Sequence, residues 1–173
     1  MEPITVVAGL LVVQGALGAF DTFFNHEWRE KLPRHRWAST ELALHSLRSA
    51  HFAFVFAGIA WLEWHGTWAW VMLAAMLSEY VVTIVDSVVE DRTRRLGAIE
   101  RANHMLLALN TGLYIAFFMA QMATRWNDLP TALAPAALPL WLQAILTACA
   151  VAVVVWTVRD GRAAQRLGKV VSG

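Results

Sequence analysis

The sequence predicts an all-α membrane protein with five transmembrane helices, and three observations support this fold class. The chain has 173 residues, of which 58% are hydrophobic and nine are tryptophan, so it is more apolar than soluble domains usually are. Five apolar segments each approach the roughly 20 residues that a helix needs to cross a bilayer. Lysine and arginine gather in alternate connections, as they do in oriented membrane proteins. We expect one integral membrane domain over residues 1–173.

The five predicted spans follow one another through short connections. They cover residues 4–24, 41–64, 68–89, 98–122 and 137–158. Only "HGT" joins the second span to the third, which predicts a tight antiparallel pair, and the loop "RWNDLPTALAPAALP" separates the fifth span from the rest. The start "MEPITVV" lacks the basic region of a signal peptide, so we interpret the first apolar run as a retained span.

The distribution of basic residues predicts the orientation. Most of the 14 lysine and arginine residues follow span 1, span 3 or span 5, and Arg125 alone lies in a connection on the opposite side. The positive-inside rule therefore places the N-terminus outside and the C-terminus, with its basic tail 159–173, in the cytoplasm. We expect the protein in a bacterial inner (plasma) membrane, in contact with membrane lipids.

Polar residues recur at matching positions in spans 1 and 3. Both spans carry them with the spacing i, i+7, i+11, which follows one stripe of a helix. The two stripes are Gln14, Asp21 and Asn25 in span 1, and Glu79, Asp86 and Glu90 in span 3.

Spans 2 and 4 also share a motif. Span 2 opens with "ELALH", which contains Glu41 and His45, and span 4 opens with "ERANH", which contains Glu100 and His104. Residues four apart lie on the same face of a helix. Each glutamate and its histidine are therefore expected to face the same neighbours.

These patterns predict a four-helix bundle of two repeated hairpins, residues 1–64 and 68–122, with 137–158 as an additional span. The predicted orientation brings the polar residues of all four helices to one depth on the cytoplasmic side. Agreement between loop charge and polar position supports this arrangement.

The polar residues indicate a metal centre, because charge inside a bilayer is costly. The predicted spans contain six candidate carboxylates but only two fixed cations, Arg48 and Arg101. Two divalent ions would balance the excess of negative charge. Carboxylate and imidazole ligands suit iron, manganese or zinc. The candidate ligands are Asp21, Glu41, His45, Glu79, Asp86, Glu90, Glu100 and His104, with His26 as a further candidate.

The ligand set resembles that of four-helix bundles that hold two irons or manganeses through carboxylates and two Glu-x-x-His pairs. It departs from that pattern, because the spacing here is Glu-x-x-x-His. It also lacks the "HxxxH" and "HxxHH" boxes of membrane desaturases and hydroxylases. The resemblance covers spans 1–4 and implies two bound metal ions, with iron the first choice, but no particular substrate.

Our first functional hypothesis is a di-iron oxidoreductase that acts on a hydrophobic, lipid-like small molecule at the cytoplasmic leaflet. Arg48 and His51 are the candidate catalytic residues beside the metal ligands, and Arg48 would orient a carboxylate or an anionic head group. Electrons would come from a separate redox partner protein, because the chain shows no nucleotide-binding motif. Span 5 and the tryptophans would allow a homo-oligomer.

Four alternatives stay open at this point. The first is a zinc-dependent membrane hydrolase, and the second is a haem b electron-transfer protein that uses His45 and His104. The third is a small cation or proton transport protein, and the fourth is a polar network without metal. Nucleic-acid binding is not expected, because the net charge is near zero, and the single Cys149 excludes a disulfide framework.

Overall fold

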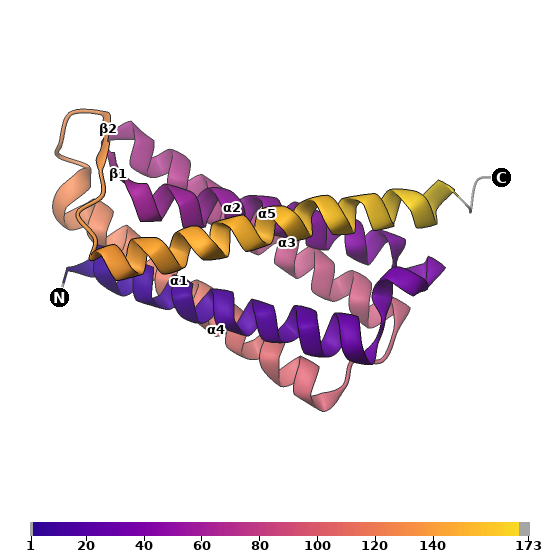
Figure 1. Cartoon of the computed structure of the whole chain (residues 1–173). Helices are drawn as coiled ribbons and strands as arrows, with labels where there is room; N and C mark the ends of the chain where they lie inside the picture. The colour runs from indigo at the N-terminus through magenta and orange to yellow at the C-terminus, as the bar shows by residue number, and fades with distance from the viewer. Residues whose placement is uncertain (1, 170–173) are drawn as a thin grey trace.

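Five long helices dominate the computed structural model, which describes residues 2–169 and is about 85% helical. They run along one common direction (Figure 1). Their bounds are α1 (Pro3–Phe20), α2 (Ser39–Trp61), α3 (Thr67–Thr93), α4 (Ala98–Gln121) and α5 (Leu140–Lys169). Each of them, in some cases together with the short helical segments next to it, is long and apolar enough to cross a membrane. The prediction of five membrane-type helices is therefore confirmed.

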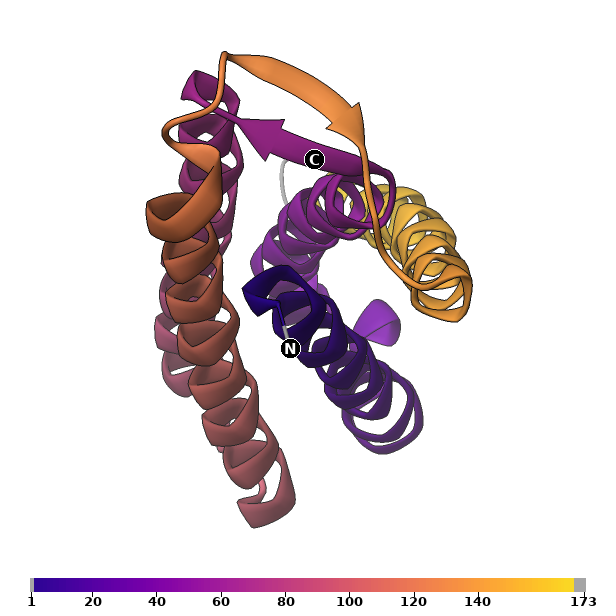
Figure 2. The same cartoon turned by 90° about the vertical axis from the view of Figure 1, so that its left-hand side faces the viewer.

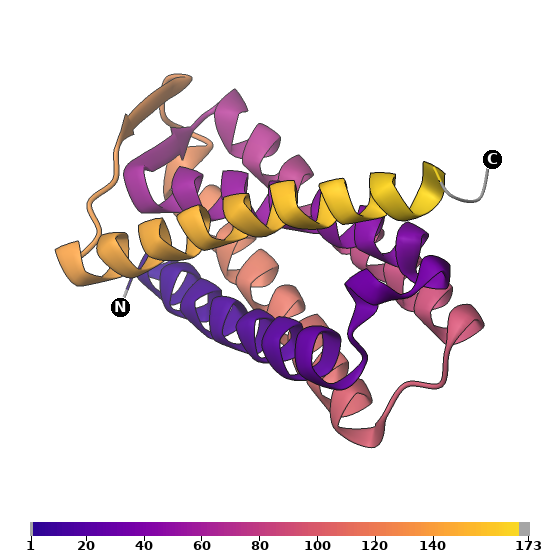
Figure 3. The same cartoon turned by 45° about the vertical axis from the view of Figure 1, so that its right-hand side comes forward.

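The packing of the helices differs from a simple pair of hairpins. α2 lies between α3 and α5, whereas α1 packs along α4 and touches α2 far less. Figure 3 shows α5 running beside α2, with α1 next to α4. Helices from the two predicted repeats thus pack against each other, while the internal repeat and the membrane orientation stay predictions.

Short helical segments extend or connect the long helices. α1 continues without a break into the π-helix η1 (Asp21–Arg29), and α4 continues into η4 (Met122–Trp126). Two 3-10 turns, η2 (Leu32–Arg34) and η3 (Arg36–Ala38), lead into α2. α5 continues as a helix to Lys169, so most of the predicted basic tail belongs to it.

A two-stranded sheet is the feature that the all-α prediction missed. β1 (Leu62–His65) pairs antiparallel with β2 (Ala132–Pro135), with Leu62 opposite Pro135 and His65 opposite Ala132. The strands lie across the end of the bundle that holds the N-terminus (Figure 2). The strands were not predicted because β1 follows α2 directly and was assigned to the second span, and because β2 lies in a proline-containing loop. The pairing ties the α2–α3 connection to the segment before α5.

Apolar packing and polar contacts occupy different halves of the bundle. The apolar core near the strands includes Val7, Leu11, Ile59, Met72 and Phe118, all fully buried. The opposite half, which holds the ends of α1 and α3 and the starts of α2 and α4, contains the buried acids and histidines.

A polar layer between α1 and α4 joins the two halves. Gln14 donates to the Thr111 hydroxyl at 3.2 Å and accepts from the Asn110 amide at 2.7 Å. Hydrogen bonds between membrane helices typically contribute about 0.6–2 kcal/mol each. Gln14 therefore holds α1 against α4 about two helical turns before Asp21, the first of the predicted ligand residues.

Candidate metal centre

Six buried carboxylates gather at the polar end of the bundle, contributed by η1, α2, α3 and α4. Each is no more than 3% exposed. The six are Asp21, Glu41, Glu79, Asp86, Glu90 and Glu100. Their burial shows that four different segments turn their acids toward one another rather than toward solvent.

The π-helix η1 brings three polar side chains from one short segment into the interior. A π-helix has more residues per turn than an α-helix, so positions four and five apart both return to the same face. Asp21, Asn25 and His26 are accordingly all buried, and the Asn25 amide donates to Asp21 Oδ1 at 2.7 Å. Single-turn π-segments inside helices are frequent at functional sites.

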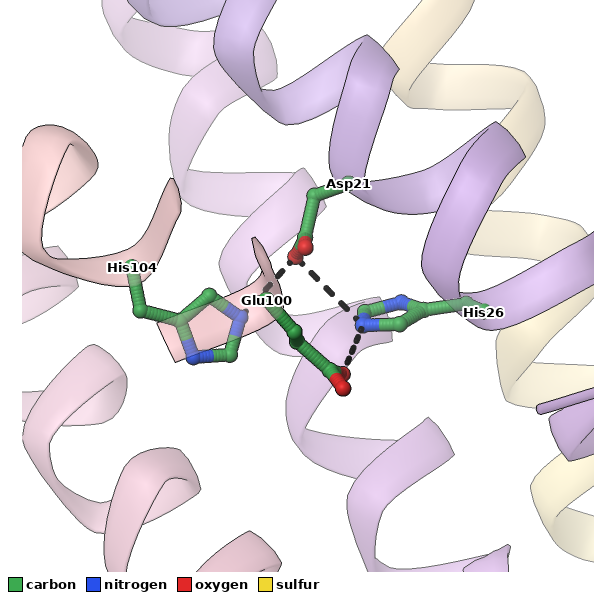
Figure 4. A group of neighbouring side chains, drawn as sticks. All are labelled: Asp21, His26, Glu100 and His104. Carbon is green, nitrogen blue, oxygen red and sulfur yellow. Dashed lines mark hydrogen bonds and ion pairs between the residues drawn. The ribbon is translucent and has the colours of Figure 1, made fainter. Parts of the chain in front are cut away.

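Asp21, His26, Glu100 and His104 form the first ligand group, hereafter the Asp21 group. Each offers one ligand atom, and the four atoms lie within 4.8 Å of one another. Asp21 Oδ2 lies 3.2 Å from His104 Nε2 and 3.4 Å from His26 Nε2, and His26 Nε2 lies 3.9 Å from Glu100 Oε1. Figure 4 shows the four side chains converging from η1 and α4.

His26, Glu41, His45 and Glu90 form the second ligand group, hereafter the Glu41 group, within the same 4.8 Å limit. The His26 and His45 rings stack with centroids 4.4 Å apart. His45 Nε2 lies 3.6 Å from Glu90 Oε1. Because His26 belongs to both groups, the two candidate ion positions are adjacent.

Glu90 connects the two groups a second time. Its Oε1 faces His45, and its Oε2 lies 3.4 Å from Nδ1 of His104. Glu90 would be a ligand in the Glu41 group and lies beside a histidine of the Asp21 group. The same geometry argues against haem, because Glu90 occupies the space between the two histidines that would have to clamp the iron.

Arg94 lies between the acids of the two groups, and sequence reasoning missed this position. Its guanidinium binds Glu41 Oε1 at 2.9 Å and Glu100 Oε1 at 2.6 Å, and it lies 3.7 Å from Glu90 Oε1. Burial opposes the charge, but the hydrogen bonds to Glu100 and Glu41 outweigh it and raise the pKa of Arg94 above its usual value. Arg94 is therefore a permanent positive charge at the rim of the site.

Arg48 holds the other two acids deeper along the bundle. Its Nη1 donates to Asp86 Oδ2 at 2.7 Å, and its Nε lies 3.9 Å from Glu79 Oε1. Glu79 also accepts from Thr83 at 2.6 Å and from Tyr114 at 3.3 Å. Glu79 and Asp86 thus lie outside both ligand groups, although Asp86 Oδ2 is 3.2 Å from His45 Nε2.

Three ligand atoms have charged neighbours but no hydrogen bond of good geometry, so they could accept a cation. Within residues 2–169, His26 Nε2, His45 Nε2 and Glu90 Oε1 are buried in this way, with opposite charges at 3.4 Å (Asp21), 3.2 Å (Asp86) and 3.7 Å (Arg94). Leaving such atoms unsatisfied costs roughly 1–3 kcal/mol each. All three belong to the ligand groups, and lone pairs on imidazole nitrogen and carboxylate oxygen are what transition metals bind.

The remaining candidate lies apart from these groups. His51 donates its Nδ1–H to the carbonyl of Leu47, one turn earlier in its own helix, at 2.9 Å, and it belongs to neither ligand group. Asp160 of α5, which sequence reasoning did not single out, is 4% exposed and pairs with Arg159 at 3.0 Å. The sequence did not indicate that Asp160 is buried, because it lies near the end of an apolar helix and next to a basic residue.

Comparisons of the chain with protein-family models, with curated proteins and with solved structures found no match. The fold and the buried site define the chain as a helical bundle with five candidate membrane spans and histidine–carboxylate groups that can hold a metal ion.

Proposed function

We propose that this protein is a membrane-embedded metalloprotein whose Asp21 group and Glu41 group together bind two transition-metal ions. The observation that carries this proposal is the convergence of two sets of four His, Asp and Glu ligand atoms, each set within 4.8 Å, among which His26 Nε2, His45 Nε2 and Glu90 Oε1 are buried and make no hydrogen bond of good geometry. The two ligand groups share His26, and Glu90 of one group lies 3.4 Å from His104 of the other, so two ions bound here would be adjacent, with His26 a ligand to one of them.

The charge balance supports two divalent cations. Apart from Asp160, which pairs with Arg159, six buried carboxylates face two guanidinium groups, those of Arg48 and Arg94. Arg94 takes the place that the sequence assigned to Arg101, which is exposed and donates to the carbonyl of Leu96. With all six acids ionised, the excess of negative charge equals the charge of two divalent ions, and uncompensated charge in a membrane is expensive.

The donor set favours iron, followed by manganese and zinc. The ligand groups contain carboxylate oxygens and imidazole nitrogens without a thiolate. Such donors suit iron, manganese and zinc, whereas soft thiolates select copper(I) and iron–sulfur clusters. A carboxylate-rich set is closer to the di-iron bundles than to a usual zinc site.

The activity that fits this centre is oxidation of a lipid-like substrate with dioxygen as the oxidant and a separate redox protein as the electron source. Bound iron would supply the dioxygen activation. The chain's own residues would hold and position the ligands: Asn25 fixes Asp21, Arg94 fixes Glu41 and Glu100, and Arg48 fixes Asp86. A substrate in the cytoplasmic leaflet would reach this end of the bundle.

Dioxygen uptake by the iron-loaded, chemically reduced protein tests this activity. We expect stoichiometric uptake by the wild type and uptake at least tenfold slower in His26→Ala. The control is His65→Ala, since His65 lies at the opposite end, paired with Glu63. Equal uptake by wild type and His26→Ala would overturn the oxidase assignment. Tightly bound zinc in a colourless protein would replace it with the hydrolase alternative.

A further inference from the structure

A cavity of about 430 Å³ lies between α1, α2 and α5 and ends at the ligand groups. Its lining begins at Ile145 of α5 and runs along that helix to Asp160. At 1.5 Å per residue this stretch of helix is about 22 Å long. The volume falls within the range of pockets that hold small organic molecules. The cavity is thus an elongated space that leads from the middle of the bundle to the candidate metal centre.

Small side chains on two facing helices create this space. α1 contributes Gly15, Gly18 and Ala19 to the wall, and α5 contributes Ala148 and Ala152. Gly15 is in close contact with α5, since a Cβ there would lie 3.0 Å from the sulfur of Cys149. Gly18, one turn closer to the metal centre, has open space where a Cβ would point. α1 and α5 are therefore in contact at Gly15 and leave open space at Gly18, on the side of the metal centre.

The rest of the wall is apolar along most of its length and polar at one end. Phe52, Phe56 and Leu107 belong to the apolar wall of the cavity, whereas Asp21, His26, His45 and Arg48 form its polar end. An apolar space of this kind favours a hydrocarbon chain over water. The polar end contains His26 and His45, whose Nε2 atoms lie 3.4 Å from Asp21 and 3.2 Å from Asp86.

One donor at the polar end indicates the chemistry of the head group. Trp156 lines the cavity, and its indole N–H is buried without an acceptor within residues 2–169. The Nε of Arg48 is turned to Glu79, at 3.9 Å from Oε1, and Glu79 is not part of the cavity wall. Buried donors without acceptors are costly, so the occupant should carry an acceptor oxygen. Arg48 already neutralises Asp86, and the acids of the wall disfavour a multiply charged phosphate.

We propose that this cavity binds a single lipid-like molecule by its apolar chain, with a carbonyl or carboxylate oxygen of that molecule at the polar end. The inference rests on the proposed function for its role as a substrate site, but the binding itself requires only the cavity. Two sources share this chemistry, a long-chain fatty acid and an isoprenoid quinone, and the test compares them directly.

The experiment measures equilibrium binding of labelled palmitic acid and of an isoprenoid quinone to the purified full-length protein. Gly18→Leu places a larger side chain in the cavity at a position that is not a candidate ligand, and Gly9→Leu is the matched control. Both glycines lie in α1, both have open space at the Cβ position, and only Gly18 lines the cavity. We expect Gly18→Leu to weaken binding of the preferred probe at least tenfold, while Gly9→Leu binds as the wild type does.

A second variant tests the head-group contact. Trp156→Phe keeps an aromatic ring but removes the donor, and one lost hydrogen bond corresponds to roughly a threefold to tenfold loss of affinity. Hexadecane, which has no oxygen, serves as the comparison probe. We expect Trp156→Phe to weaken binding of the oxygen-bearing probe and to leave hexadecane binding unchanged.

The outcomes separate this proposal from the metal centre, because metal content is measured in the same samples. Selective loss of palmitic acid binding identifies a fatty acyl occupant, and selective loss of quinone binding identifies a quinone. Absence of binding to the wild type, or equal effects of Gly18→Leu and Gly9→Leu, would overturn the proposal. Probe binding by a wild-type protein that holds no metal would support the cavity site and refute the proposed function.

Discussion

The imidazole rings of His26 and His45 stack face to face, with centroids 4.4 Å apart and planes inclined by only 5°. One ring comes from the π-helix η1 and the other from α2, and both Nε2 atoms are buried without a hydrogen-bond partner. Side chains that are packed this closely and left unsatisfied are expected where a ligand completes the site. The pair therefore marks the centre of the proposed metal site.

Replacement of His26 should remove a ligand from one ion position, because His26 belongs to both candidate groups and offers a single ligand atom. We expect His26→Ala to hold about one metal ion per chain fewer than the wild type. The measurement is elemental analysis of the purified variant beside His65→Ala, which should keep the wild-type content. Full metal content in His26→Ala would contradict the shared-ligand arrangement.

Ligands that belong to one group should affect one ion position. Glu100→Ala and His104→Ala each remove a member of the Asp21 group, and Glu41→Ala removes a member of the Glu41 group. We expect each variant to lose about one metal ion per chain, because the other group keeps its full ligand set. Metal titration with elemental analysis checks this. Retention of full stoichiometry by both Glu100→Ala and His104→Ala would refute the ligand assignment.

Loss of Arg94 should destabilise the metal-free protein most. Arg94 binds Glu41 and Glu100, and removing one partner of a buried ion pair costs roughly 3–5 kcal/mol. Bound metal would supply part of the missing positive charge. We expect Arg94→Gln to lower the thermal unfolding midpoint more in chelator than in metal-supplemented buffer.

Arg95→Gln is the matched control for that comparison, because Arg95 is the exposed neighbour in sequence. It should leave the midpoint unchanged under both conditions. A decrease for Arg94→Gln that is the same with and without metal would show that Arg94 acts independently of any bound cation.

Removal of metal should itself lower stability. A ligand that binds only the folded state stabilises it by about 2.7 kcal/mol at a concentration one hundred times its Kd. We expect chelation to lower the unfolding midpoint of the wild type and re-addition of the native metal to restore it. His26→Ala should show a much smaller response, and an equally large response in this variant would argue for binding elsewhere.

The predicted orientation can be tested with single cysteines in a Cys149→Ala background. Asp128→Cys lies in the connection before α5, and Arg95→Cys lies in the connection between α3 and α4. We expect a membrane-impermeant thiol reagent to label Asp128→Cys in intact cells and Arg95→Cys only after the membrane is opened. The reverse pattern would invert the topology and place the metal centre at the outer leaflet.

Sequence reasoning was most effective where the chemistry follows α-helical spacing. Glu41 and His45, four residues apart in α2, fall in one ligand group, and Glu100 and His104, four apart in α4, fall in the other. The local geometry of a helix fixes such pairs before any tertiary contact forms. The five apolar spans were predictable for the same reason, because bilayer thickness sets their length.

The features that helical spacing did not define depend on local irregularity or on distant contacts. His26 was only a further candidate in the sequence, and it reaches both ligand groups because η1 is a π-helix, whereas the 3.6-residue period places it away from the Asp21 stripe. Arg94 follows α3 and reaches Glu41, 53 residues away in the chain, and the sequence pattern does not show this contact. The packing of α1 on α4 also depends on contacts such as Gln14 with Thr111, which link residues far apart in the chain.

Elemental metal analysis of the detergent-purified wild-type protein, together with its visible spectrum, tests the central claim most directly. We expect about two iron or manganese ions per chain and no Soret band. Absence of any stoichiometric metal would contradict it, and the buried acids and histidines would then form a network held by the protein alone.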